Sequence, residues 1–157
     1  MAPKALDGIM DKMIIEVESE QAMKQLGQKI GAQLKGGEVF ELVGDVGAGK
    51  TTFTKGLAVG LGIEDDVQSP SFTISRTYEA RDGLQLVHYD FYRLADAGIM
   101  ASEVAEMVRD PLTVTIVEWA DIVEGILPDD RITLSISASS ENARSVKASD
   151  ALRGVIG

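Results

Sequence analysis

One short segment constrains the fold of this chain more than any other part of its sequence. It spans residues 44–51, reads GDVGAGKT, and matches the pattern G-x-x-x-x-G-K-[ST] at every fixed position. The β-rich run 38–43 precedes it, and Phe53, Leu57 and Leu61 follow it at helical spacing. A strand, a glycine-bearing loop and a helix in this order predict a phosphate-binding loop, or P-loop.

Each fixed position of this segment suits a particular contact with a nucleotide. Glycines let the backbone turn tightly and direct successive N–H groups inward, where the positive end of the helix dipole also favours an anion. Lys50 adds a mobile charge between the β and γ phosphates of ATP, and Thr51 offers a hydroxyl ligand to Mg²⁺. The alternative is a glycine-rich loop with a surface lysine. We expect the nucleotide to be bound by Asp45, Val46, Gly47, Ala48, Gly49, Lys50, Thr51 and Thr52.

Hydrophobic periodicity predicts two more helices. One begins at Ser19 as its N-cap and ends before residues 36–37, and the other is capped by Asp96 and closed at residues 110–111. Strands are predicted at 14–17, 71–78, 84–89, 112–117, 131–137 and 144–148. The second and third of these strands form a hairpin around the turn at 81–83, and the last two pair with each other.

Helices that alternate with strands early in the chain, followed by an antiparallel pair, predict an α/β fold. We expect a three-layer P-loop NTPase domain with a mixed, mostly parallel central sheet and antiparallel edge strands. Residues 1–157 are interpreted as a single domain, with a loose leader at 1–12 and a tail at 149–157 that no pattern places.

Composition excludes several classes of function. The formal charge of −10 comes from 25 acidic and 15 basic side chains, and it repels a phosphate backbone, so direct binding of DNA or RNA is not expected. The chain has no cysteine, which excludes thiol nucleophiles, cysteine zinc sites and disulfides. No apolar run has the length of a signal peptide or a membrane span. These features predict a soluble, cytoplasmic protein without membrane contacts.

Two carboxylates are candidates for completing a magnesium and hydrolysis site. Glu118 directly follows a β-branched run, at the carboxyl end of a strand that we expect to be buried on both faces, and it is the better metal ligand. Asp90 ends the run 86–89 and would hold a magnesium-bound water or orient the attacking water. An N-cap or a solvated strand end is the alternative for each. With Lys50, these two residues form the predicted catalytic set.

Other residues near the motif have two interpretations each. The segment 68–73 lies where nucleotide-sensing loops occur in P-loop proteins, and a capped turn is the alternative. Its hydroxyl groups belong to Ser69, Ser71 and Thr73. Trp119 either walls the nucleotide pocket or fills the core. His88, the single histidine, is interpreted as a packed strand residue rather than a proton shuttle, and Arg93 either neutralises phosphate or forms a salt bridge.

Four motifs in register resemble one known family. They occupy residues 44–52, 69–73, 88–94 and 117–120. Their order and spacing over residues 20–136 are similar to those of TsaE, also called YjeE, the bacterial ATPase of tRNA threonylcarbamoyladenosine biosynthesis. The pieces H-x-D-x-Y-R-L and V-E-W distinguish this family from other P-loop proteins.

The resemblance implies a slow, partner-dependent ATPase that uses ATP and Mg²⁺. It implies work with the TsaB and TsaD proteins, which transfer a threonylcarbamoyl group to adenosine 37 of tRNA (t6A), and contact with tRNA only through that complex. By motif match, Lys50 and Thr51 would bind phosphate and Mg²⁺, Glu118 would complete the metal site, and Asp90 would assist hydrolysis through water.

Two other functions use a similar phosphate-binding loop. A small-molecule kinase needs an acceptor pocket and usually an arginine-bearing lid, and no segment here is rich in arginine. A nucleotide-dependent switch module of the GTPase type needs N-K-x-D to read guanine, and the single asparagine, Asn142, is not followed by lysine. ATP is therefore the expected nucleotide.

Overall fold

The computed structural model describes residues 13–156 except residues 46, 69, 71–73 and 93. Its strands are β1 (Met13–Val17), β2 (Val39–Val43), β3 (Ser75–Glu79), β4 (Gln85–Asp90), β5 (Thr113–Glu118), β6 (Ile132–Ala138) and β7 (Arg144–Ala148). Its helices are α2 (Glu20–Gln33), α3 (Lys50–Gly60), α4 (Met100–Met107) and α5 (Arg153–Ile156), with 3₁₀ turns η1 (Arg81–Gly83), η2 (Ala120–Val123) and η3 (Asp150–Leu152). Within this part of the chain, none of the helices has the length and apolar character needed to cross a membrane.

The seven strands form one sheet in the order β1-β7-β6-β2-β5-β4-β3. The four central strands β6, β2, β5 and β4 are mutually parallel, and the edge strand β3 pairs antiparallel with β4. On the other side, β7 is antiparallel to both β6 and β1. The predicted mixed sheet with a parallel centre and antiparallel edges is confirmed. Its parallel strands end at a common edge, where β2 leads toward α3.

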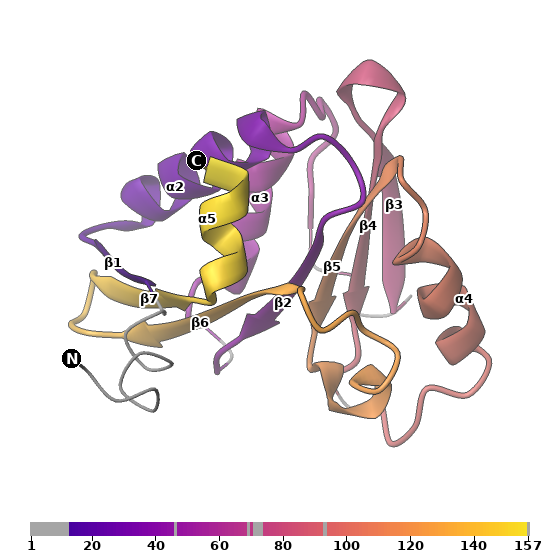
Figure 1. Ribbon diagram of the computed structural model, residues 1–157. Helices are drawn as coiled ribbons and strands as arrows, with labels where there is room; N and C mark the ends of the chain where they lie inside the picture. Colours follow the sequence, from indigo (N-terminus) through magenta and orange to yellow (C-terminus); the bar gives the residue numbers. More distant parts are fainter. Residues whose placement is uncertain (1–12, 46, 69, 71–73, 93, 157) are drawn as a thin grey trace, which may run out of the picture.

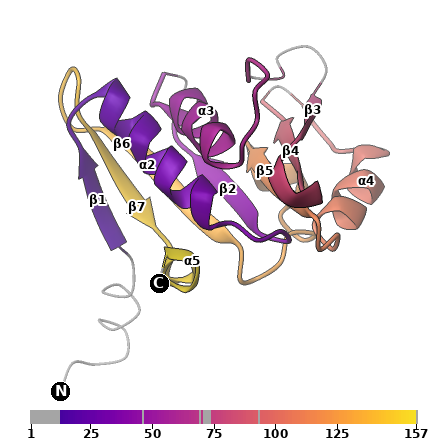
Figure 2. The ribbon, with the colours of Figure 1, turned by 90° about the horizontal axis from the view of Figure 1, so that it is seen from above.

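Helices cover both faces of this sheet, which gives the predicted three layers. Figures 1 and 2 show α2 and α3 side by side on one face and α4 on the other. One apolar cluster joins the first face to α2, α3 and η3, and includes Ile116; a second joins the other face to α4 and η2, and includes Val117. Neighbouring residues of β5 point to opposite faces of the sheet, and both faces are covered. Every residue of this strand is therefore buried, as its β-branched sequence predicts.

Glycines allow α2 and α3 to approach at backbone distance. A Cβ atom added at Gly27 or Gly31 of α2, or at Gly56 or Gly60 of α3, would lie under 3.0 Å from backbone atoms of the facing helix. Each pair is spaced by four residues and therefore lies on one side of its helix. The amphipathic pattern of α2 predicts a buried face, and the structure shows that glycines form part of it.

Several local predictions are confirmed. Ser19 is the N-cap of α2, and its hydroxyl accepts a hydrogen bond from the Ala22 N–H at 3.0 Å. Strands β3 and β4 form the expected hairpin around η1, and β6 and β7 form the expected antiparallel pair. The short strand expected at 14–17 is β1.

The start of α4 differs from the prediction, and the tail, which no pattern placed, is structured. Helix α4 begins at Met100, so Asp96 is not its N-cap; Gly98 has a positive φ of 55°, which interrupts helical geometry between the two. The tail forms η3 and α5, because Leu152 is fully buried against the sheet. The leader 1–12 lies outside the described residues.

Candidate functional site at the carboxyl edge of the sheet

The start of α3 carries backbone N–H groups that have no partner within the helix. The first helical hydrogen bond of α3 runs from the Phe53 N–H to the Gly49 carbonyl at 3.0 Å, so the N–H groups of residues 50–52 have no partner within the helix. Gly49 is the N-cap and supplies no side chain to satisfy them. These donors, together with the positive end of the helix dipole, form a site suited to an anion.

The glycines of this loop are required by its shape. Gly44 has a φ of 155°, and a Cβ there would lie 2.6 Å from the Ile136 carbonyl oxygen of β6. Gly47 has a φ of 85° with no atom within 4 Å of its added Cβ, and Gly49 has a φ of 113°. The loop therefore presses against β6 at its start and is open to solvent at Gly47.

Lys50 is buried, with 6% of its surface exposed, and it contacts three partners. Its Nζ donates a hydrogen bond to the Gly44 carbonyl at 2.5 Å and lies 3.7 Å from Glu118 Oε1. The same ammonium lies 4.4 Å from the centre of the Trp119 ring, within the range of a cation–π contact. The amine that the motif assigns to phosphate is thus held inside the site by groups of the protein itself.

Glu118 and Asp90 lie next to each other at the ends of adjacent strands. They are paired in the register of β5 and β4, as the sequence predicts for two strand-end acids at one sheet edge. Glu118 is 3% exposed, and its Oε2 lies 2.6 Å from Nε2 of His88. Asp90 is half-buried, and its Oδ1 accepts a hydrogen bond from the Tyr92 N–H at 3.0 Å.

Trp119 contacts the site and the core at once. Its backbone is left-handed, with a φ of 56°, which turns the chain sharply after β5. Its ring covers Lys50 on one side and packs against Tyr92 at a centroid distance of 4.8 Å. With Lys50 and Gly44 it lines a cavity of about 130 Å³ at the end of β2. Trp119 therefore lines a cavity beside Lys50 and is partly buried against the apolar cluster of α4 and η2, while its role toward a nucleotide stays a prediction.

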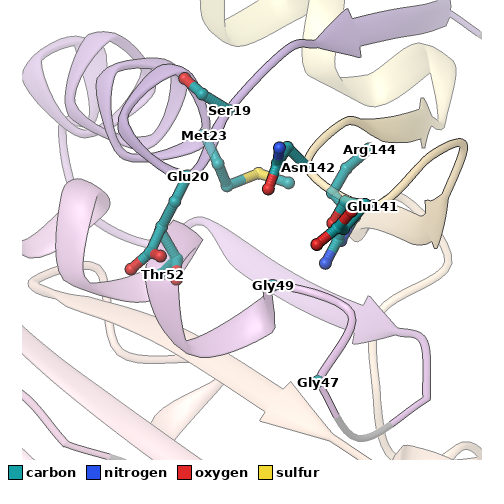
Figure 3. A pocket seen from close by; sticks show the side chains of 9 residues that line it. All are labelled: Ser19, Glu20, Met23, Gly47, Gly49, Thr52, Glu141, Asn142 and Arg144. Atoms are coloured by element: carbon teal, nitrogen blue, oxygen red, sulfur yellow. The ribbon is translucent and has the colours of Figure 1, made fainter.

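A larger cavity of about 270 Å³ lies on the other side of the loop (Figure 3). It is lined by Ser19, Glu20, Met23, Gly47, Gly49, Thr52, Glu141, Asn142 and Arg144. Figure 3 shows Met23 pointing toward Asn142, from α2 and from the turn between β6 and β7. The Arg144 Nε also donates a hydrogen bond to the Ala48 carbonyl at 3.1 Å, so β7 helps to hold the loop.

Most of the lining residues of this cavity were missed by the sequence analysis. Gly47, Gly49 and Thr52 belong to the predicted phosphate-binding loop, and Ser19 was predicted as a helix cap. The five residues that were missed come from α2, from the turn before β7 and from the start of β7, which are far apart in the chain and carry no common motif. This side of the cavity can therefore be located only from the fold.

The structure brings Lys50, Glu118 and Trp119 into contact and places Asp90 beside them. Thr51 and Thr52 are half-buried in the first turn of α3 and line a groove against α2. Asp45 is exposed, and its carbonyl accepts a hydrogen bond from the Ala48 N–H at 3.0 Å. Five other predicted residues lie outside the described residues; they are Val46, Ser69, Ser71, Thr73 and Arg93. Among the residues that are described, no three His, Cys, Asp or Glu side chains cluster as a metal cage. A magnesium ion here would need oxygen ligands from a nucleotide and water besides the protein.

Comparisons with known proteins agree on one family. The model of the family described as "Threonylcarbamoyl adenosine biosynthesis protein TsaE" matches residues 17–146. The chain is 41% identical over 128 residues to the tRNA threonylcarbamoyladenosine biosynthesis protein TsaE of Bacillus subtilis, covering 78% of this chain and 76% of the relative. It is 36% identical over 128 residues to the TsaE protein of Treponema pallidum, covering 82% of this chain and 93% of the relative.

A solved structure is also similar. The crystal structure of Bacillus subtilis YdiB superposes with a TM-score of 0.69 at 34% sequence identity, covering 87% of this chain and 84% of the other. The region that the family model matches, residues 17–146, includes the loop, both strand-end acids and the turn before β7. The chain therefore belongs to the TsaE family, whose members take part in the biosynthesis of threonylcarbamoyladenosine in tRNA.

Proposed function

We propose that this protein is an ATPase of the P-loop NTPase fold that binds ATP with Mg²⁺ between β2 and α3 and hydrolyses it slowly. The observation that carries this proposal is the set of N–H groups at the start of α3 that have no partner within the helix and lie next to a buried lysine and a buried strand-end carboxylate. These are the donor, the mobile cation and the metal ligand that phosphoryl transfer requires.

The residues present fit a triphosphate with a divalent cation. The N–H groups of residues 50–52 and the open backbone at Gly47 are suited to phosphate oxygens. The Thr51 hydroxyl and Glu118 would supply one or two oxygen ligands to Mg²⁺, which is the number this ion usually takes from a protein in nucleotide sites. When bound, the ion would neutralise charge that develops on the phosphate oxygens.

Lys50 and the two acids would act in separate ways. Lys50 would exchange its hydrogen bond with the Gly44 carbonyl for contacts with the β and γ phosphates. Glu118 would keep its Oε2 with His88 and present Oε1 to the metal. Asp90 would orient the attacking water from the neighbouring strand end.

The cavity of Figure 3 would receive the nucleoside of ATP. Its floor is the phosphate-binding loop itself, because Gly47, Gly49 and Thr52 line it. Met23 offers an apolar surface for a base, and Asn142 offers both a hydrogen-bond donor and an acceptor. One ATP molecule would thus place its triphosphate on the loop and its base in this cavity.

We further propose that the ATPase supports the TsaB–TsaD assembly in the cytoplasm during t6A formation, and contacts tRNA only through that assembly. Membership of the family supports a role in this modification pathway. The formal charge of −10 supports an indirect route to tRNA, since an acidic protein has little attraction for a phosphate backbone. Direct contacts with DNA or membranes are not part of the proposal.

Isothermal titration calorimetry of three proteins tests the nucleotide site. Lys50→Ala removes a charged hydrogen-bond donor and is expected to weaken ATP–Mg²⁺ binding by about 10- to 100-fold, whereas Lys29→Ala, on the exposed side of α2, leaves it unchanged. Glu118→Gln is expected to bind ATP without Mg²⁺ normally but to lose hydrolysis. Wild-type affinity in Lys50→Ala would refute the proposed site.

A second experiment addresses the partners. The chain is purified with TsaB and TsaD from the same cell, and ATP hydrolysis is measured with and without the pair. We expect slow hydrolysis alone and faster hydrolysis with both proteins. Rapid hydrolysis that does not respond to the pair would contradict the accessory role and favour a kinase-type reaction with another acceptor.

A further inference from the structure

The only histidine of the chain lies in the interior of β4 and contacts Glu118. His88 is fully buried, and its Nε2 lies 2.6 Å from Glu118 Oε2, a short distance for a hydrogen bond to a carboxylate. In the register of the two strands, His88 is opposite Ile116 and Asp90 is opposite Glu118. The imidazole therefore contacts a carboxylate two residues beyond the register partner of His88 on β5.

The second ring nitrogen of His88, Nδ1, has no polar contact comparable with that of Nε2 among the described residues. His88 Nδ1 is buried and has no hydrogen-bond partner among the described residues. A neutral imidazole that donates from Nε2 to this carboxylate carries its ring hydrogen on Nε2 and leaves Nδ1 as an unpaired acceptor. The fold thus leaves one polar atom of His88 unpaired and satisfies only the atom that contacts Glu118.

The two oxygens of Glu118 have different surroundings. Oε2 is bound to His88 in the protein interior, and Oε1 lies 3.7 Å from Lys50 Nζ, on the side of the phosphate-binding loop. A carboxylate fixed at one oxygen cannot rotate freely about its last bond. The oxygen that remains is directed at the place where the loop would bring the phosphates.

We propose that His88 is a positioning residue, which fixes the Glu118 carboxylate so that Oε1 alone is presented to the magnesium ion. This inference rests on the proposed function, since it takes Glu118 as the metal ligand. Protein groups that hold a metal ligand in place are usually important for metal binding, and their loss weakens metal affinity about 10- to 100-fold. His88 would therefore affect Mg²⁺ and leave the metal-free binding of nucleotide unchanged.

Two substitutions of similar size separate the hydrogen bond from simple packing. His88→Gln keeps an N–H donor at a distance along the side chain comparable with Nε2, and His88→Met fills similar space without a donor. Calorimetry measures ADP binding without Mg²⁺, and then the apparent affinity for Mg²⁺ at saturating ADP. We expect equal ADP affinity in all three proteins, Mg²⁺ affinity close to wild type in His88→Gln, and a loss of about 10- to 100-fold in His88→Met.

The same measurements distinguish the two proposals. A wild-type protein that binds neither ADP nor Mg²⁺–ADP would overturn the proposed function. Wild-type Mg²⁺ affinity in His88→Met, with ADP binding intact, would overturn only the role of His88. A loss of equal size in both variants would mean that packing, and not the donor, matters, and would also overturn it.

Nitrogen NMR of the untagged wild-type protein gives an answer that does not depend on whether the variants fold. Because the chain has one histidine, its two ring nitrogens are observed without overlap. We expect hydrogen on Nε2, and a shift of the Nε2 signal in Glu118→Gln. Hydrogen on Nδ1 alone would exclude the bond to Glu118 and refute the proposal.

Discussion

Replacing Gly56 with alanine tests the close contact between α2 and α3. The added Cβ would meet the Lys24 carbonyl and two further backbone atoms of that residue at 3.0 Å or less. Backbone atoms cannot move aside as a flexible side chain does, so the helices must separate. Overpacking of this kind costs about 1–3 kcal/mol, and alanine returns about 0.5–1 kcal/mol of helix propensity. We expect a net loss of about 1 kcal/mol from the free energy of unfolding, which corresponds to a fall in Tm of about 2–4 °C for a chain of this size.

Urea denaturation followed by circular dichroism measures this change, with Gly154→Ala as the matched control. Gly154 is also helical, in α5, and its added Cβ would have nothing within 4 Å, so the control should be unchanged or up to about 1 kcal/mol more stable. Because the first turn of α3 carries the N–H groups that we propose bind phosphate, Gly56→Ala should also weaken ATP binding. A variant as stable as the wild type would show that the helices can separate without cost, and would refute the reasoning.

Two further substitutions probe polar contacts on both sides of the sheet. Arg81→Ala removes hydrogen bonds from the guanidinium to the carbonyls at the ends of α2 and α3, and should lower the free energy of unfolding by about 2–3 kcal/mol in urea; a change under about 0.5 kcal/mol would contradict the capping role. Burial raises the pKa of Tyr89, whose hydroxyl donates to Glu103 Oε2 at 2.8 Å. As the pH rises, Tyr89 therefore ionises in the unfolded chain before it ionises in the folded protein. The stability that its neutral hydroxyl contributes is present below about pH 10, and above that pH it is lost by up to about 1.4 kcal/mol per pH unit. Tyr89→Phe should show a shallower loss of stability between about pH 10 and pH 11 in denaturation experiments, and parallel pH profiles would exclude this cause.

Local patterns were sufficient to predict most of the elements. The Ser19 cap, the hairpin of β3 and β4, and the fully buried β5 depend on residues close together in sequence, and each was confirmed. Asp96 was assigned wrongly because an acid before an apolar pattern resembles an N-cap, whereas a glycine with positive φ delays the helix to Met100. The tail could not be placed, because its structure follows from burial of Leu152 against distant strands.

The candidate site shows the same division between local and distant information. The loop and both strand-end acids could be located from their own motifs, since the carboxyl ends of parallel strands share one edge. The interpretation of His88 as a packed residue agrees with its burial, yet its contact with Glu118 depends on the pairing of β4 with β5. The contribution of Arg144 to the loop depends in turn on the position of β7 in the sheet.

The position of β7 between β1 and β6 also determines when the sheet can be completed during synthesis. Met13 pairs with Ala148, so among the described strands β1 leaves the ribosome long before β7, the strand that pairs with it. An early, unpaired strand is prone to association with other chains, and contacts between distant residues slow folding. The same late strand brings Arg144 against the carbonyl of Ala48. A chain that is cut before residue 144 therefore lacks both the hydrogen bond from Arg144 to the loop and the strand that pairs with β1.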